Sequence, residues 1–127
     1  MKKLMFLVLA ISVLFTGCSG TAVVPVYKKI TATEAKKMID SDKNITILDV
    51  RTLSEYDEGH IKGSILITDT ELKVKVGNVL KDKNKTILVY CRSGRRSKDS
   101  AEILIQMGYK NVLDFGGIID WTYETEK

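Results

Sequence analysis

The fold of this chain is decided by one stretch, Thr86-Ile87-Leu88-Val89-Tyr90-Cys91-Arg92-Ser93-Gly94-Arg95-Arg96-Ser97. Residues 86–90 are apolar and rich in β-branched side chains, which predicts a strand buried on both faces of a parallel sheet. From Ser97 onward, apolar side chains recur at helical spacing as far as Gly108, which is placed to end the helix. The stretch therefore predicts a strand, a loop and a helix in succession, and with them an α/β fold.

Cys91 comes directly after the predicted strand, where open α/β sheets place their ligand crevice. Backbone donors of the loop, the positive end of the next helix and the guanidinium groups of Arg92, Arg95 and Arg96 should favour the thiolate form of Cys91. The alternative is an inert buried cysteine beside surface arginines. Gly94, which permits close backbone approach, and the three arginines together favour an anion-binding loop.

The loop from Cys91 to Arg96 resembles the active-site loop of rhodanese-like sulfurtransferase domains. Other motifs match this family in the same order: Leu48-Asp49-Val50-Arg51, Glu55-Tyr56 and Gly59-His60-Ile61-Lys62-Gly63 before the loop, and Gly108-Tyr109, Asn111-Val112, Gly116-Gly117 and Trp121 after it. The resemblance implies a three-layer α/β sandwich, with a mostly parallel central sheet of about five strands flanked by helices.

The same resemblance implies Cys91 as the catalytic nucleophile. It assigns the binding of substrate and persulfide to Arg92, Ser93, Gly94, Arg95 and Arg96. Asp49 and Arg51, at the carboxyl end of a neighbouring strand, are expected to support the loops around the pocket by an ion pair or hydrogen bonds. His60, the one histidine, is expected to bond nearby backbone as a neutral side chain, because a thiolate nucleophile needs no general base.

Loop length separates two reactions of this fold. Phosphatases that form a phosphocysteine place an arginine after the cysteine and five further residues, whereas Arg96 comes one position earlier and Ser97 stands at the phosphatase position. By resemblance, the shorter loop predicts transfer of sulfane sulfur from a donor such as thiosulfate or a persulfide to a thiol or cyanide, through a Cys91 persulfide. The alternatives are a non-catalytic rhodanese-like binding module and a phosphatase or arsenate reductase.

The first 28 residues differ in character from the rest. A basic start, an apolar run at residues 4–15 and a small-residue site predict a signal peptide at residues 1–17, followed by a tether at residues 18–28 and the domain at residues 29–127. The run is shorter than the roughly 20 residues of a membrane span. Phe15-Thr16-Gly17-Cys18 resembles a bacterial lipoprotein box, so a lipid on Cys18 is expected to anchor an exported protein on the extracytoplasmic side of a membrane. The alternative is a plain secretory signal or an uncleaved anchor.

Charge and composition restrict the kinds of binding partner that are expected. Removing the charges of Lys2 and Lys3 from the net charge of +4 leaves about +2, too little for nucleic-acid binding. The sequence has no metal-ligand spacing and implies no cofactor. Cys91 is the only thiol of the predicted domain, so the acceptor thiol must come from another molecule. A monomer is expected, with a small-molecule sulfur donor and a thiol acceptor as its partners.

Local patterns predict the remaining elements. Capping boxes at Thr31 and Thr52 each begin a helix, the second ending at Gly59. Strands are expected at residues 45–50, 64–67 and 111–114, turns at residues 59–63 and 116–117, and a closing helical turn at residues 118–123. A helix is expected at residues 70–80, with Leu72, Val76, Val79 and Leu80 inward and Lys73, Lys75, Lys81, Lys83 and Lys85 forming a solvated face.

Overall fold

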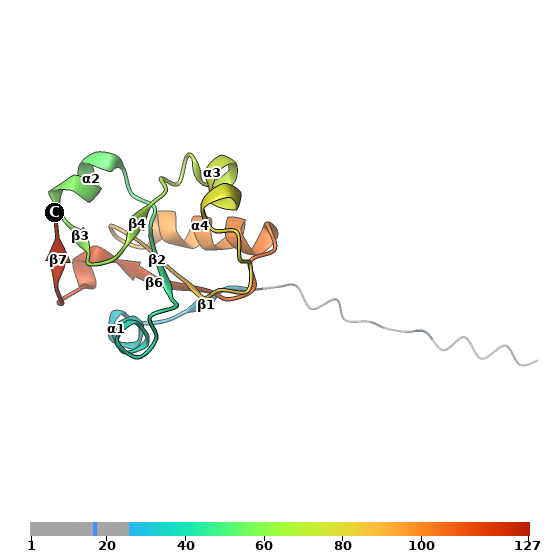
Figure 1. Ribbon diagram of the computed structural model, residues 1–127, viewed down its shortest axis with the longest axis horizontal. Helices are drawn as coiled ribbons and strands as arrows, with labels where there is room; N and C mark the ends of the chain where they lie inside the picture. Colours follow the sequence, from blue (N-terminus) through green and yellow to red (C-terminus); the bar gives the residue numbers. More distant parts are fainter. Residues whose placement is uncertain (1–16, 18–25) are drawn as a thin grey trace, which may run out of the picture.

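A computed structural model describes Gly17 and residues 26–127. The rest of the predicted signal peptide and Cys18, the predicted lipidation residue, lie outside the described residues. A five-stranded sheet runs through the domain in the order β1-β6-β5-β2-β4 (Figure 1). Each pair of neighbouring strands is parallel, which confirms the predicted sheet. Its strands are β1 (Lys28–Lys29), β2 (Thr46–Asp49), β4 (Ile65–Leu66), β5 (Ile87–Cys91) and β6 (Val112–Gly117).

Helices cover both faces of this sheet. Helix α1 (Ala32–Ser41) lies on one face, and α3 (Leu72–Val79) and α4 (Arg95–Gln106) lie on the other (Figure 1). A short α2 (Leu53–Glu58) follows β2, and a 3₁₀ turn, η1 (Ile118–Asp120), follows β6. The core on the α1 side includes Ala35, Leu88, Tyr90, Phe115 and Trp121. The core on the other side includes Leu72, Val76, Val89, Ala101 and Leu104. The three-layer sandwich is confirmed, and no helix in the described part of the chain has the length and apolar character to cross a membrane.

Local sequence signals place the helix ends correctly. The Thr31 hydroxyl accepts a hydrogen bond from the Glu34 N–H at 3.1 Å, and the Glu34 carboxylate accepts one from the Thr31 N–H at 2.7 Å. Thr52 and Glu55 form the same reciprocal pair at the start of α2. Gly108 ends α4 in the left-handed conformation, with φ of 94°. The predicted caps and the predicted helix end are therefore confirmed.

Local sequence patterns did not predict two short strands that pair with each other from distant parts of the chain. The expected turn at residues 59–63 contains β3 (His60–Ile61), which pairs antiparallel with β7 (Thr125–Glu126). Two strands of two residues each carry no periodicity that a sequence could display. Helix α3 spans less than the predicted residues 70–80 and ends at Val79, whose side chain is 54% exposed rather than inward.

The end of β6 also differs from the prediction. Gly116 and Gly117, expected as a tight turn, belong to the strand, where the register with β5 shifts between Val89 and Cys91. The closing helical turn is confined to the three residues of η1, and Trp121 after it packs in the core as expected. The strand therefore continues past Gly116, which has a φ of 85°, and Gly117 pairs with Cys91.

A buried polar cluster joins the carboxyl ends of β2 and β5. Arg51 Nη2 lies 2.7 Å from an oxygen of Asp49 and also donates to the Gly59 carbonyl at 2.7 Å. The Tyr90 hydroxyl donates to Asp49 at 2.6 Å, and burial followed by the Asp49 contact raises the pKa of Tyr90. This is the ion pair that the sequence predicts, and it fixes the start of the segment between β2 and α2.

Replacing Arg51 with methionine should lower the free energy of unfolding by about 3–5 kcal/mol, because Asp49 would keep a buried charge without its partner. Chemical denaturation measures the change. Lys36→Met, which removes the exposed pair with Asp40, is the matched control and should cost less than about 1 kcal/mol. Equal effects of the two substitutions would show that the buried pair contributes no more than a surface one.

Candidate active site

The Cys91 side chain ends β5 and is held by the loop that follows it. The Gly94 N–H donates a hydrogen bond to Cys91 Sγ at 3.0 Å. Gly94 adopts a left-handed φ of 108° at the N-cap of α4, a conformation that glycine favours. Helix α4 begins at Arg95, so the positive end of its dipole lies at this loop. Both features stabilise negative charge on the sulfur.

The three arginines of the loop have different surroundings. Arg96 makes a bidentate ion pair with Glu55 of α2, with both N–O distances at 2.8 Å. Arg92 and Arg95 are exposed and form no ion pair with any described residue. Sequence reasoning grouped all three, because Glu55 is 41 positions away and already has a visible local role as a capping residue. Arg92 and Arg95 are therefore the guanidinium groups free to meet an anion.

The pair between Arg96 and Glu55 should make folding stability depend on pH. Hydrogen bonds from Arg96 first, and from Thr52, lower the pKa of Glu55 from its usual value to about 2. Because the pKa is lowered in the folded state, the stabilisation is complete above the ordinary carboxyl pKa and is lost as the pH falls toward 2.

Between pH 5 and pH 2, the wild-type protein should therefore lose about 1–3 kcal/mol more unfolding free energy than Glu55→Gln, allowing for screening at a partly exposed site. Denaturant titrations at several pH values measure this difference. The matched control is Glu102→Gln on α4, which should keep the wild-type slope. If the unfolding free energies of wild type and Glu55→Gln fell equally with pH, the pair between Arg96 and Glu55 would not be the source of this pH dependence.

Two residues outside the predicted site fix the shape of the loop. Ser97 Oγ lies 3.1 Å from the Gly94 carbonyl oxygen and 3.3 Å from that of Gly116, so one hydroxyl joins the loop to β6. A Cβ at Gly117 would lie 2.1 Å from the Arg92 carbonyl oxygen. The adjacent glycines at 116–117 were the available signal, because close backbone approach is one reason for glycine in a strand.

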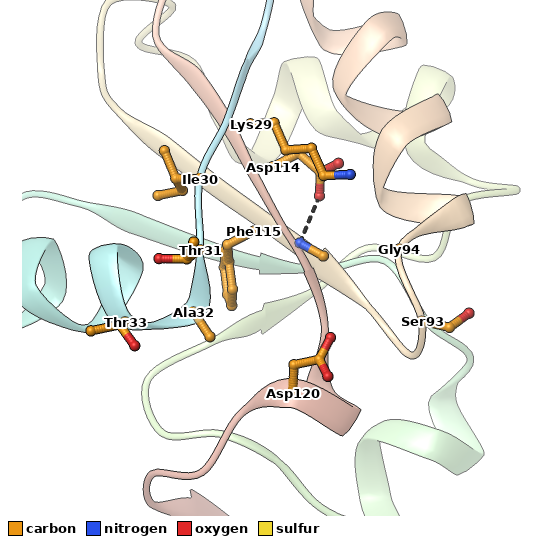
Figure 2. Close-up of a pocket in the computed structure, with 11 residues that line it drawn as sticks. Lys29, Ile30, Thr31, Ala32, Thr33, Ser93, Gly94, Asp114, Phe115 and Asp120 are labelled. Carbon is orange, nitrogen blue, oxygen red and sulfur yellow. Dashed lines mark hydrogen bonds between the residues drawn. The ribbon is translucent and has the colours of Figure 1, made fainter.

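Cavities flank the loop on two sides. One has a volume of about 490 Å³ and lies between the end of β6, the start of α1 and the loop (Figure 2). In Figure 2 Asp114 accepts a hydrogen bond from the Gly116 N–H, at 2.9 Å, on the wall of this cavity. Another cavity of about 290 Å³ is lined by Arg51, Arg92 and Ile119, among others. Groups larger than a small anion therefore have room beside the loop.

Of the remaining candidates, the structure describes His60 but not Cys18. His60 is buried, its Nδ1 lies 2.9 Å from the Tyr56 carbonyl oxygen and its ring stacks on Tyr56, which confirms the expected bond to backbone. Within the described residues no group of three or more His, Cys, Asp or Glu side chains is placed to hold a metal ion. Cys18 lies outside the described residues.

Residues 31–124 match the rhodanese-like domain family. The chain belongs to this family. The rhodanese-like domain is 41% identical over 73 residues to the thiosulfate sulfurtransferase PspE of Escherichia coli, covering 58% of this chain and 70% of PspE. It is 37% identical over 92 residues to the putative sulfur carrier protein YrkF of Bacillus subtilis, covering 72% of this chain. The chain spans 49% of YrkF, about half the length of that relative.

Solved structures show the same likeness. The rhodanese-like domain superimposes on a rhodanese with anions from Escherichia coli with a TM-score of 0.62 and 37% identity, covering 65% of this chain and 98% of the other. It superimposes on a protein from Staphylococcus saprophyticus with a TM-score of 0.71 and 30% identity, covering 79% of this chain and 99% of the other. The fold and the family predicted from the sequence are both confirmed.

Proposed function

We propose that this rhodanese-like domain is a sulfurtransferase that carries sulfane sulfur as a persulfide on Cys91. The observation that carries the proposal is the Gly94 N–H bonded to Cys91 Sγ at 3.0 Å, at the start of α4, since that arrangement stabilises an anionic sulfur. Relatives that are named sulfurtransferases support the reaction class. The donor is a small anion such as thiosulfate or a persulfide, and the acceptor is a thiol or cyanide.

The reaction balances in two displacements. The Cys91 thiolate attacks the outer sulfur of thiosulfate, a new S–S bond forms on Cys91, and the donor S–S bond breaks with its electron pair leaving on sulfite. Loop N–H groups, that of Gly94 among them, then stabilise the negative terminal sulfur. An acceptor thiolate or cyanide attacks that sulfur, and the Cys91 thiolate leaves. Two easier steps replace one difficult step, as nucleophilic catalysis does in general.

Arg92 and Arg95 bind the anionic part of the donor in this scheme. Arg92→Gln and Arg95→Gln should each raise the KM for thiosulfate about two- to fivefold, the effect of an exposed ion pair, with little change in kcat. The steady-state rate of thiocyanate formation measures both constants. Lys98→Gln removes a charge further along α4 and should leave KM unchanged. An unchanged KM in both arginine variants would show that other groups bind the donor.

Structural details weigh against the two rival functions. Ser97 occupies the position of the phosphatase arginine, is fully buried and lies within hydrogen-bond distance of the Gly94 and Gly116 carbonyl oxygens, so no guanidinium stands there. A non-catalytic binding module has no need of a cysteine held by a backbone amide, and Cys91 is so held.

One comparison separates the three functions. The purified full chain is incubated with thiosulfate and cyanide, and in parallel with an arylphosphate. Thiocyanate formation without phosphate release is expected. Phosphate release without thiocyanate would identify a phosphatase, and no turnover of either substrate would favour a binding module.

For location, we propose that a lipid on Cys18 anchors the protein on the extracytoplasmic side of a bacterial membrane. Support comes from the basic start, the apolar run at residues 4–15 and the match of Phe15-Thr16-Gly17-Cys18 to a lipoprotein box. Labelled palmitate should enter the protein in growing cells and be lost in Cys18→Ala. Label retained by that variant would rule out Cys18 as the acceptor.

A further inference from the structure

Three loops lie together at the amino end of the parallel sheet. They precede β2, β5 and β6, and hydrogen bonds join them. The Lys110 N–H donates to the Lys83 carbonyl at 2.9 Å, and the Thr46 N–H donates to the Thr86 carbonyl at 3.0 Å. Lys28 begins β1 and pairs with Leu113, close to the start of β6. These segments form one end of the domain.

These segments carry six lysines and two carboxylates. Most of the lysine side chains make no hydrogen bond or ion pair with a described residue. Lys83 is the exception, because its Nζ donates to the Met107 carbonyl at 2.7 Å. The carboxylates of Asp42 and Asp82 each accept a nearby backbone N–H. The other five lysines, here called the amino-edge lysines, are exposed and make no hydrogen bond or ion pair from their side chains with a described residue: Lys28, Lys43, Lys81, Lys85 and Lys110.

The catalytic loop lies at the opposite end. Because the strands are parallel, Cys91 ends β5 beside the end of β6, a strand of six residues and therefore about 20 Å long. In Figure 1, α4 begins on the side toward which the β6 arrow points and ends on the side where β1 lies. The catalytic end carries the carboxylates of Asp69, Glu71 and Asp120 together with the exposed guanidinium groups of Arg92 and Arg95.

The N-terminal segment indicates the kind of surface that the amino-edge lysines face. Residues before Lys28 join the domain at this end, and they include the apolar run at residues 4–15 and Cys18. Nine residues lie between Cys18 and Lys28, and the ten steps from one to the other span at most about 35 Å. With the membrane attachment proposed above, through a lipid on Cys18 or through the apolar run, the lysines lie on the side of attachment. Anionic headgroups attract lysines within a Debye length of about 8 Å.

We propose that the amino-edge lysines rest on an anionic bilayer surface and turn Cys91 toward the aqueous phase. Donor and acceptor then reach Cys91 from solution, and the bilayer does not cover the catalytic loop. This orientation goes beyond sulfur transfer: it rests on the proposed membrane attachment and does not depend on the chemistry of Cys91.

Lysine acetylation on vesicles tests the orientation. The full chain is reconstituted in vesicles of phosphatidylcholine alone and of phosphatidylcholine with phosphatidylglycerol, treated with a water-soluble acetylating reagent and mapped by mass spectrometry. The amino-edge lysines should react at least about fivefold more slowly on the anionic vesicles, and high salt should remove the difference. Lys29 and Lys98 should react equally on both, and alkylation of Cys91 should be equally fast on both.

Variants of equal charge provide the matched comparison. The triple variant Lys81→Gln, Lys85→Gln, Lys110→Gln should lose the protection of Lys43, and Lys29→Gln, Lys37→Gln, Lys98→Gln should keep it. Equal acetylation on both vesicles, protection of Lys29 and Lys98 instead, or a chain that stays in solution with both vesicles would overturn the proposal. Sulfur transfer measured in the same samples reports separately on the proposed function.

Discussion

Replacing Cys91 with serine should abolish sulfur transfer and lower thiocyanate formation by at least about 10³-fold. The serine hydroxyl can still accept the Gly94 N–H, yet it cannot carry a sulfane sulfur as a thiolate does. The other cysteine of the chain is Cys18, outside the predicted domain. The measurement is the rate of thiocyanate formation from thiosulfate and cyanide.

Stability of the Cys91→Ser protein is the control for this result. Serine is close in size to cysteine, so we expect the free energy of unfolding to change by about 1 kcal/mol, and the lost activity then reflects chemistry rather than unfolding. Turnover in the folded serine protein at the wild-type rate would remove Cys91 from the mechanism.

Replacing Gly117 with alanine should lower the rate of sulfur transfer by about 10²-fold, because the new side chain would displace the catalytic loop. An alanine Cβ would lie 2.1 Å from the Arg92 carbonyl oxygen and 2.7 Å from Ser93 Cα. Both neighbours are backbone atoms, so the catalytic loop or the end of β6 must move. A displacement of about 1 Å at a catalytic group can cost this much in rate.

The matched control for that substitution is Gly77→Ala in α3, where a Cβ meets no atom within 4 Å. It should leave activity unchanged and stabilise the fold by about 0.5–1 kcal/mol, because alanine favours a helix more than glycine does. Thiocyanate formation and chemical denaturation measure both variants. A Gly117→Ala protein with wild-type activity would show that the loop tolerates the contact without losing its catalytic shape.

The fold could be predicted where its signals are local. Residues 86–90 and the helical spacing after Ser97 lie within one stretch, and the capping boxes at Thr31 and Thr52 each act within four residues. The pairing of β3 with β7 could not be predicted, because it joins two very short segments more than sixty residues apart. The outward side chain of Val79 likewise depends on where α3 ends against the rest of the domain.

The candidate site was predictable only as far as its residues are contiguous. The loop from Cys91 to Arg96 could be recognised from its composition. Composition alone could not show that Arg96 is ion-paired whereas Arg92 and Arg95 are not. That separation depends on Glu55, which approaches through the packing of α2 against the loop. The contact of Gly117 with Arg92 depends in the same way on the register of β6 beside β5. Long-range packing therefore decides which loop residues are free to act.

The persulfide on Cys91 is the intermediate on which the proposed function depends, and intact-mass spectrometry detects it directly. After incubation with thiosulfate and removal of the excess, the wild-type chain is predicted to gain the mass of one sulfur atom. Cyanide should remove that mass, and Cys91→Ser should never acquire it. A wild-type chain of unchanged mass, or the same gain in Cys91→Ser, would contradict sulfur transfer through Cys91.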